Sequence, residues 1–309
     1  MNPLTATDLR GTWGTLLLPI DEDDAIDFTR LERQLAHLVA SGLRGIYTNG
    51  TAGEFLAQSH EEYLAISRLV AEACGGAGLP FQLGASHASP QILLRRVRDT
   101  RHLEPGAYQV ILPDWVPPTA EEAIDFLRRV AEVAEGVGLV LYLPPHAKRH
   151  FGPEAVARFA AEVPAVIGVK MLDGHAEWYG AVRRHLPGLA VFVPGHHLAT
   201  GLLQGAHGSY SNVACLSPRG AARWEAQIQH DPLAGLDVQR RIVDFLQLAV
   251  APWAARGLMG PALDKFLAAI GGWADAGTRL RWPYRAIPQA EAERQRDLAR
   301  TMVPELWPT

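Results

Sequence analysis

The chain has 309 residues, of which 48% are hydrophobic and 20% are charged, and its formal net charge is −4 at pH 7. These values are typical of a soluble globular protein, and the length allows one large α/β domain or two smaller ones. The weak negative charge argues against nucleic acid or an anionic membrane surface as a partner.

Along the chain, short apolar segments alternate with amphipathic ones. The first twelve residues are polar and unlike a signal peptide, and no apolar stretch is as long as a membrane span, so we expect a cytoplasmic protein. Composition and length predict β-strands over residues 12–18, 44–49, 81–85, 107–112, 139–143, 163–171, 190–193 and 208–214. Apolar residues at helical spacing predict intervening helices over 28–40, 59–73, from 89 onward, 119–134, 153–161, 178–185 and 198–203.

Eight strands that alternate with helices predict a parallel sheet. A doubly wound sheet would require a glycine-rich phosphate loop after the first strand, and Pro19-Ile20-Asp21 is not such a loop. Eight units in about 220 residues fit a (β/α)8 TIM barrel better. We therefore predict an α/β protein with a barrel core over residues 1–217. Residues 218–309 would supply the eighth barrel helix and a three-helix extension, with helices over 233–250, 259–270 and 290–302.

The sixth predicted strand, residues 163–171, is a β-branched apolar run that contains Lys170. Lysine occurs only three times in the chain, as Lys148, Lys170 and Lys265. An amine in a dry cleft has a lowered pKa, and its neutral form is able to attack a carbonyl group. The alternative is a lysine at the strand edge that caps the strand or pairs with a carboxylate.

In a TIM barrel the active site lies at the C-terminal ends of the strands. Lys170, Tyr142 at the end of the fifth strand and the loop 50–54 after the second strand would all lie there. A phenol beside an amine nucleophile is able to transfer protons, and a loop with two glycines lets backbone N–H groups approach a carboxylate. Taken singly, Tyr142 would be read as a core residue and the loop as an ordinary turn.

In this order, the motifs resemble those of the dihydrodipicolinate synthase/N-acetylneuraminate lyase family. The loop resembles the family's GTTGE signature, and further segments resemble its YNxP motif, its GxK lysine motif and its GxxS strand. The matching residues are Gly50-Thr51-Ala52-Gly53-Glu54, Tyr142-Leu143-Pro144-Pro145, Gly168-Val169-Lys170 and Gly208-Ser209-Tyr210-Ser211. The resemblance runs from about residue 11 to the C-terminus and includes the helical extension.

The resemblance implies a lyase of the class I aldolase type that needs neither a cofactor nor a metal. Its small-molecule partner would be pyruvate or a longer 2-keto acid, bound as an imine on Lys170. Tyr142 would be the acid/base, Thr51 its hydrogen-bond partner, and the Thr51-Ala52 backbone the cradle for the carboxylate. The implied substrate-contacting positions are Gly50, Thr51, Ala52, Tyr210, Ser211, Trp115, His146 and Gly195. The family also implies a homo-oligomer, either a dimer or a tetramer.

Several positions depart from the family pattern. Ala52 replaces the second threonine of the signature, and Asp114-Trp115 replaces a tyrosine pair whose second member completes a proton relay between subunits. An indole donates a hydrogen bond but does not relay a proton. Ala147 stands where the synthase has its carboxylate-binding arginine, and Met171-Leu172-Asp173-Gly174-His175 replaces the usual Asp-Ser-Ser-Gly-Asp. These departures argue against dihydrodipicolinate synthase activity.

Three functions remain open. The first is a lyase that cleaves or dehydrates a 2-keto acid through the same imine, as an aldolase or as a 2-keto-3-deoxy acid dehydratase. The second is a ligand-binding barrel without efficient chemistry. The third, a metal-dependent aldolase of the same fold, is disfavoured because the predicted strand ends lack the acidic and histidine ligands that class II chemistry requires. His146, His150, His196 and His197 are loop histidines, which usually bind no metal without a nearby acidic or thiol partner. His146, Trp115 and His196 are candidates for the variable wall of the pocket.

Overall fold

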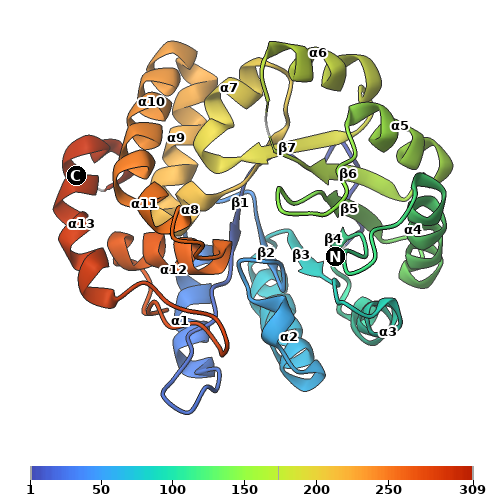
Figure 1. Ribbon diagram of the computed structural model, residues 1–309, viewed down its shortest axis with the longest axis horizontal. Helices are drawn as coiled ribbons and strands as arrows, with labels where there is room; N and C mark the ends of the chain where they lie inside the picture. Colours follow the sequence, from blue (N-terminus) through green and yellow to red (C-terminus); the bar gives the residue numbers. More distant parts are fainter. Residues whose placement is uncertain (1, 173, 308–309) are drawn as a thin grey trace.

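In the computed structural model, which describes residues 2–172 and 174–307, eight parallel strands pair in sequence order and close into a barrel (Figure 1). The predicted TIM barrel is therefore confirmed. The strands are β1 (Gly11–Thr15), β2 (Gly45–Thr48), β3 (Phe81–Gly84), β4 (Ala107–Ile111), β5 (Gly138–Tyr142), β6 (Val166–Lys170), β7 (Ala190–Pro194) and β8 (Gly208–Tyr210).

Helices follow the strands and surround the barrel (Figure 1). They are α1 (Phe28–Val39), α2 (His60–Ala77), α3 (Pro90–Thr100), α4 (Ala120–Ala134), α5 (Pro153–Glu162), α6 (Ala176–His185), α7 (Leu198–Leu203), α8 (Asn212–Leu216) and α9 (Pro218–His230). The three predicted C-terminal helices are present as α10 (Pro232–Ala249), α12 (Gly260–Gly271) and α13 (Gln289–Met302), and the short α11 (Ala251–Ala254), which was not predicted, lies between the first two. Single 3-10 turns lie at η1 (Phe55–Ala57), η2 (Arg101–Leu103), η3 (Gly195–His197) and η4 (Pro304–Leu306).

The helix ends follow from local side-chain chemistry. At the start of α2, the hydroxyl of Ser59 accepts from the backbone N–H of Glu62, whose carboxylate accepts from the Ser59 N–H. Thr119 and Glu122 form the same reciprocal capping box at the start of α4. Each box satisfies backbone N–H groups that the first turn leaves without partners. Among the described residues, no helix combines the length and the apolar character required to cross a bilayer.

The eighth strand is shorter than predicted. It ends at Tyr210, and the residues expected to continue it to position 214 form the start of α8 instead. The cause is Ser211, whose hydroxyl accepts from the backbone N–H of Ala214 at 3.0 Å and caps the helix. The prediction was wrong here because a short run of small and polar residues suits both a strand and a capped turn.

Inside the barrel, large side chains fill the space, so that the barrel has a packed core and no pore. Trp13, Tyr47, Phe192 and Tyr210 form one buried aromatic cluster within this interior. The Tyr210 hydroxyl donates to the Gln82 side-chain oxygen at 2.7 Å, which fixes the ring in the barrel. This cluster forms a rigid base below the C-terminal strand ends.

The C-terminal extension is attached to the barrel through buried charges. Glu54, in the loop after β2, forms an ion pair with Lys265 of α12, and both side chains are almost completely buried. The Lys265 ammonium also donates to the backbone oxygen of Arg279 at 2.5 Å, and the Arg281 N–H donates to Glu54 at 3.0 Å. Arg281 in turn binds both carboxylate oxygens of Glu62 on α2. These contacts hold α12 against the barrel, beside α8 (Figure 1).

Candidate active site

Lys170 and Tyr142 are the last residues of neighbouring strands and pair directly in register across β5 and β6. The Lys170 ammonium lies 4.1 Å from the centre of the Tyr142 ring. It also lies 5.4 Å from the ring of Tyr210 and 5.5 Å from the ring of Tyr47. Three aromatic rings therefore surround the amine within the range of cation–π attraction.

The surroundings change the acidity of this amine. Burial lowers the pKa of Lys170 to about 8, although the charges of Asp264 and Cys215 act in the opposite direction. With a pKa near 8, about one lysine in ten carries a neutral amine at pH 7, against about one in 2,500 for an ordinary lysine. The neutral form of an amine is the one able to attack a carbonyl carbon.

A cavity of about 400 Å³ opens at Lys170. Six of the residues predicted for the site line this cavity: Thr51, Ala52, Tyr142, His146, Lys170 and Tyr210. Burial, with a further contribution from the Asp264 charge, raises the pKa of Tyr142, so its phenol is protonated at neutral pH. Within the described residues no hydrogen bond joins Thr51 to Tyr142, although both line the same cavity.

Four of the predicted substrate-contacting positions, Gly50, Trp115, Gly195 and Ser211, do not line this cavity. Ser211 caps α8, and Gly195 lies so close to it that a Cβ atom there would collide with the serine side chain. Gly50 packs beside the Tyr47 ring and the Gln109 side chain. The Trp115 side chain is 85% exposed, and the Lys148 ammonium lies 5.0 Å from the centre of its ring.

Sequence reasoning missed Asp264, Tyr47, Asn212 and Cys215, which also line the cavity. Asp264 belongs to α12 of the extension, which also contributes Gly260 and Leu263 to the lining, and it adds a carboxylate to the cavity. Burial raises the pKa of Asp264 to about 6, although the Lys170 charge opposes this shift. One signal was available in the sequence: Asp264 and Lys265 are the only charged residues of this otherwise apolar helix.

His196, a predicted candidate for the pocket wall, does line the cavity. Its ring bonds to the Asn212 side chain, and burial together with the neighbouring His197 lowers the pKa of His196 to about 4. The imidazole is therefore neutral at physiological pH. Among the described residues, no group of three or more histidine, cysteine or acidic side chains is arranged to hold a metal ion.

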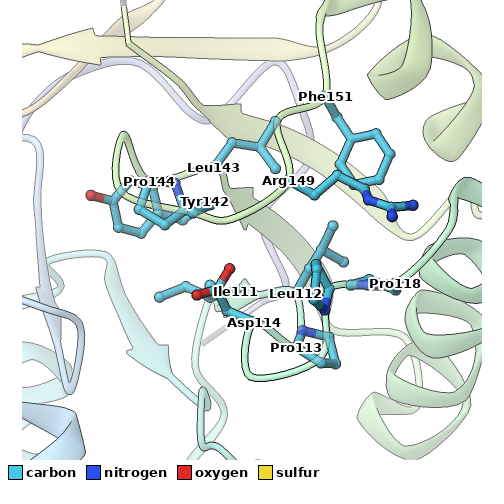
Figure 2. Close-up of a pocket in the computed structure, with 12 residues that line it drawn as sticks. Ile111, Leu112, Pro113, Asp114, Pro118, Tyr142, Leu143, Pro144, Arg149 and Phe151 are labelled. Atoms are coloured by element: carbon cyan, nitrogen blue, oxygen red, sulfur yellow. The ribbon is translucent and has the colours of Figure 1, made fainter.

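The two cations nearest in sequence to Ala147 are directed away from the site. Figure 2 shows the loops after β4 and β5, in which the Tyr142 phenol and the Arg149 guanidinium point to opposite sides. Arg149 and Phe151 line a small crevice of about 20 Å³ that shares Tyr142 with the cavity at Lys170. The Lys148 ammonium donates to the Trp115 backbone oxygen at 2.9 Å. Neither cation takes the place of the missing arginine.

Comparison with known proteins places the chain in a family. Residues 8–230 match the model of the dihydrodipicolinate synthetase family. The chain is 24% identical to trans-O-hydroxybenzylidenepyruvate hydratase-aldolase of Sphingobium xenophagum, over 93% of this chain and 91% of the relative. It is 29% identical to N-acetylneuraminate lyase of Escherichia coli, over 67% and 70% of the two chains.

Solved structures show the same fold. The structure of YagE, a prophage protein of this family from Escherichia coli K12 in complex with pyruvate, superposes with a TM-score of 0.82. The alignment covers 97% of this chain and 99% of the other, at 17% identity. The chain therefore belongs to the dihydrodipicolinate synthetase family and is a lyase of the aldolase type.

Proposed function

We propose that the protein forms an imine between Lys170 and a 2-keto acid and then cleaves the substrate between C3 and C4. The observation that carries this proposal is an amine with a pKa of about 8 at the end of a barrel strand, in a cavity of about 400 Å³. The pyruvate complex reported for YagE is consistent with a keto acid in such a site.

The chemistry follows from the imine. The neutral amine adds to the C2 carbonyl, water leaves, and the resulting iminium withdraws electrons from C3. A base takes the proton of the C4 hydroxyl, the C3–C4 bond breaks, and the electron pair moves into an enamine while an aldehyde is released. The enamine takes up a proton at C3, and water then hydrolyses the imine to free pyruvate and Lys170.

Different residues around Lys170 would transfer the protons and hold the carboxylate of the 2-keto acid. Tyr142 pairs with Lys170 in register and carries a protonated phenol. This phenol would donate its proton to the C2 hydroxyl that leaves as water, and the phenolate so formed would be the base that takes the proton of the C4 hydroxyl. Thr51 and Ala52 line the same cavity, and their backbone N–H groups would hold the carboxylate. Tyr210 has its hydroxyl bound to Gln82 and would serve mainly as packing.

A dehydration would use the same intermediate. If the C4 hydroxyl leaves as water after C3 loses a proton, the iminium again acts as the electron sink. The relative named hydratase-aldolase combines both reaction types in its name, which supports keeping the two within one proposal.

The test is reductive trapping. Borohydride in the presence of pyruvate should add one reduced adduct to the wild-type chain, as measured by intact-mass spectrometry. Lys170→Met should abolish the adduct, whereas the matched control Lys148→Met, which changes an exposed lysine, should retain it. An adduct in Lys170→Met, or none in the wild type across a panel of 2-keto acids, would refute the imine and favour the ligand-binding alternative.

A further inference from the structure

A second cavity, of about 510 Å³, adjoins the one at Lys170. The two cavities share Thr51, His146 and Gly260 in their linings. A ligand held at Lys170 by its first carbon atoms would therefore extend its remaining part into the second cavity. Its volume lies within the range of sites that enclose small organic ligands.

The wall of this second cavity is mainly apolar. Phe55 and Leu56 come from η1, Ile111 from the end of β4, and Leu258 and Met259 from the segment before α12. Leu56 is 55% exposed and adds accessible apolar surface to this wall. The buried Glu54–Lys265 pair lies next to both η1 and α12, so these two sides of the wall are held in a fixed relation.

Among the described residues, no lysine or arginine lines this cavity to pair with a negatively charged group of a ligand. Within residues 2–172 and 174–307, Lys170 is the only cation that lines the neighbouring cavity. Asp114, by contrast, presents a carboxylate. One of its oxygens accepts from the Lys148 backbone N–H at 2.7 Å. A second carboxylate or a phosphate on the substrate would meet like charge there without a partner.

We infer that the second cavity binds the C4 substituent of the 2-keto acid, and that this substituent is an uncharged apolar group such as an aryl or branched alkyl group. The inference rests on the proposed function. Cleavage of such a 4-hydroxy-2-keto acid moves the hydroxyl proton to the base and releases pyruvate and an apolar aldehyde. His146 and Asp114 remain available for one polar atom on the group.

The reverse reaction tests this directly. Pyruvate is incubated with benzaldehyde, isobutyraldehyde, glyceraldehyde or the anionic aspartate semialdehyde, and the aldol product is quantified by chromatography and mass spectrometry. For the wild type, we expect kcat/KM to be about 100-fold higher for benzaldehyde than for the semialdehyde. A preference for the polar or anionic aldehydes, or no product with any aldehyde, would overturn the inference.

Two variants sharpen the result. Leu56→Arg, at a partly exposed position that tolerates a long side chain, should reduce the benzaldehyde preference about tenfold or more. Met259→Arg repeats the test from the opposite wall if the first variant fails to fold. Leu233→Arg changes an exposed leucine on α10 outside both cavities and is the control. Borohydride trapping with pyruvate is measured on the same samples. A trapped imine with the wrong aldehyde preference refutes only the inference, whereas loss of trapping in the wild type refutes the proposed function.

Discussion

Two opposing influences determine the charge of Lys170. Burial favours the neutral amine, whereas the Asp264 carboxylate favours the ammonium and keeps the pKa of Lys170 from falling below about 8. The same interaction acts on Asp264, where the ammonium opposes the rise in pKa caused by burial. The amine thus depends on a residue from a helix outside the eight βα units.

Asp264→Asn tests this dependence. Removing the negative charge removes a stabilising influence on the ammonium, so the pKa of Lys170 should fall further below about 8. More neutral amine is then present at a given pH, and the pH profile of imine formation should shift to lower pH. The rate of borohydride-trappable adduct formation measures the profile. Asp237→Asn, at an exposed position on α10, is the control. An unchanged profile, or a shift to higher pH, contradicts the assignment.

Tyr142→Phe separates proton transfer from binding. Loss of a positioned acid/base group should reduce kcat by about 10²–10⁴. The Kd for the 2-keto acid, measured by calorimetry, should change only slightly because the backbone at Thr51 and Ala52 is untouched. Tyr210→Phe, which removes a hydroxyl bound within the barrel, is the comparison. Near-normal turnover of Tyr142→Phe would exclude the phenol from the mechanism.

At the scale of elements, the ion pair between Glu54 and Lys265 joins α12 to the loop after β2. Lys265→Met would leave a buried carboxylate without its cation, which typically costs about 3–5 kcal/mol of unfolding free energy. Chemical denaturation should detect a loss of this size. The double variant Glu54→Gln/Lys265→Met should recover much of it, because no charge is then left unpaired. A loss in Lys265→Met below about 1 kcal/mol would show that the pair is not essential to the docking of α12.

The sequence predicted the elements better than their contacts. Strands and helices follow periodic patterns of a few residues, and capping residues such as Ser59 mark helix starts, so most elements were found. The residues of the signature motifs were found for the same local reason. Asp264 was missed because its role depends on where α12 docks, and that depends on a buried pair between residues far apart in the chain. The exposure of Trp115 could likewise not be predicted, because the sequence of a loop does not indicate in which direction each of its side chains points.

At the scale of the whole molecule, the loop after β4 carries an exposed apolar surface. Trp115 is 85% exposed and Val116 is 75% exposed. The family resemblance implies a homo-oligomer, and side chains of this kind are enriched at interfaces between protein chains. We therefore expect this surface to lie between subunits.

Analytical ultracentrifugation of Trp115→Arg tests that expectation. A charged side chain at an apolar contact should shift the protein to a smaller species than the wild type at equal concentration. Trp282→Arg replaces another exposed tryptophan, on the segment before α13, and should leave the assembly unchanged. If the wild type sediments as a monomer, or if both variants behave like it, Trp115 does not contribute to an interface.

The docking of α12 has a consequence for how such enzymes diverge. Leu258, Met259 and Asp264 all come from beyond the eighth barrel strand, yet they line the two adjoining cavities. Under the proposed function, we expect a chimera of this chain that carries a relative's C-terminal helical extension to acquire part of that relative's aldehyde preference while it keeps Lys170 and Tyr142. The residues that select the substrate would then change independently of the barrel strands that carry the lysine and the phenol.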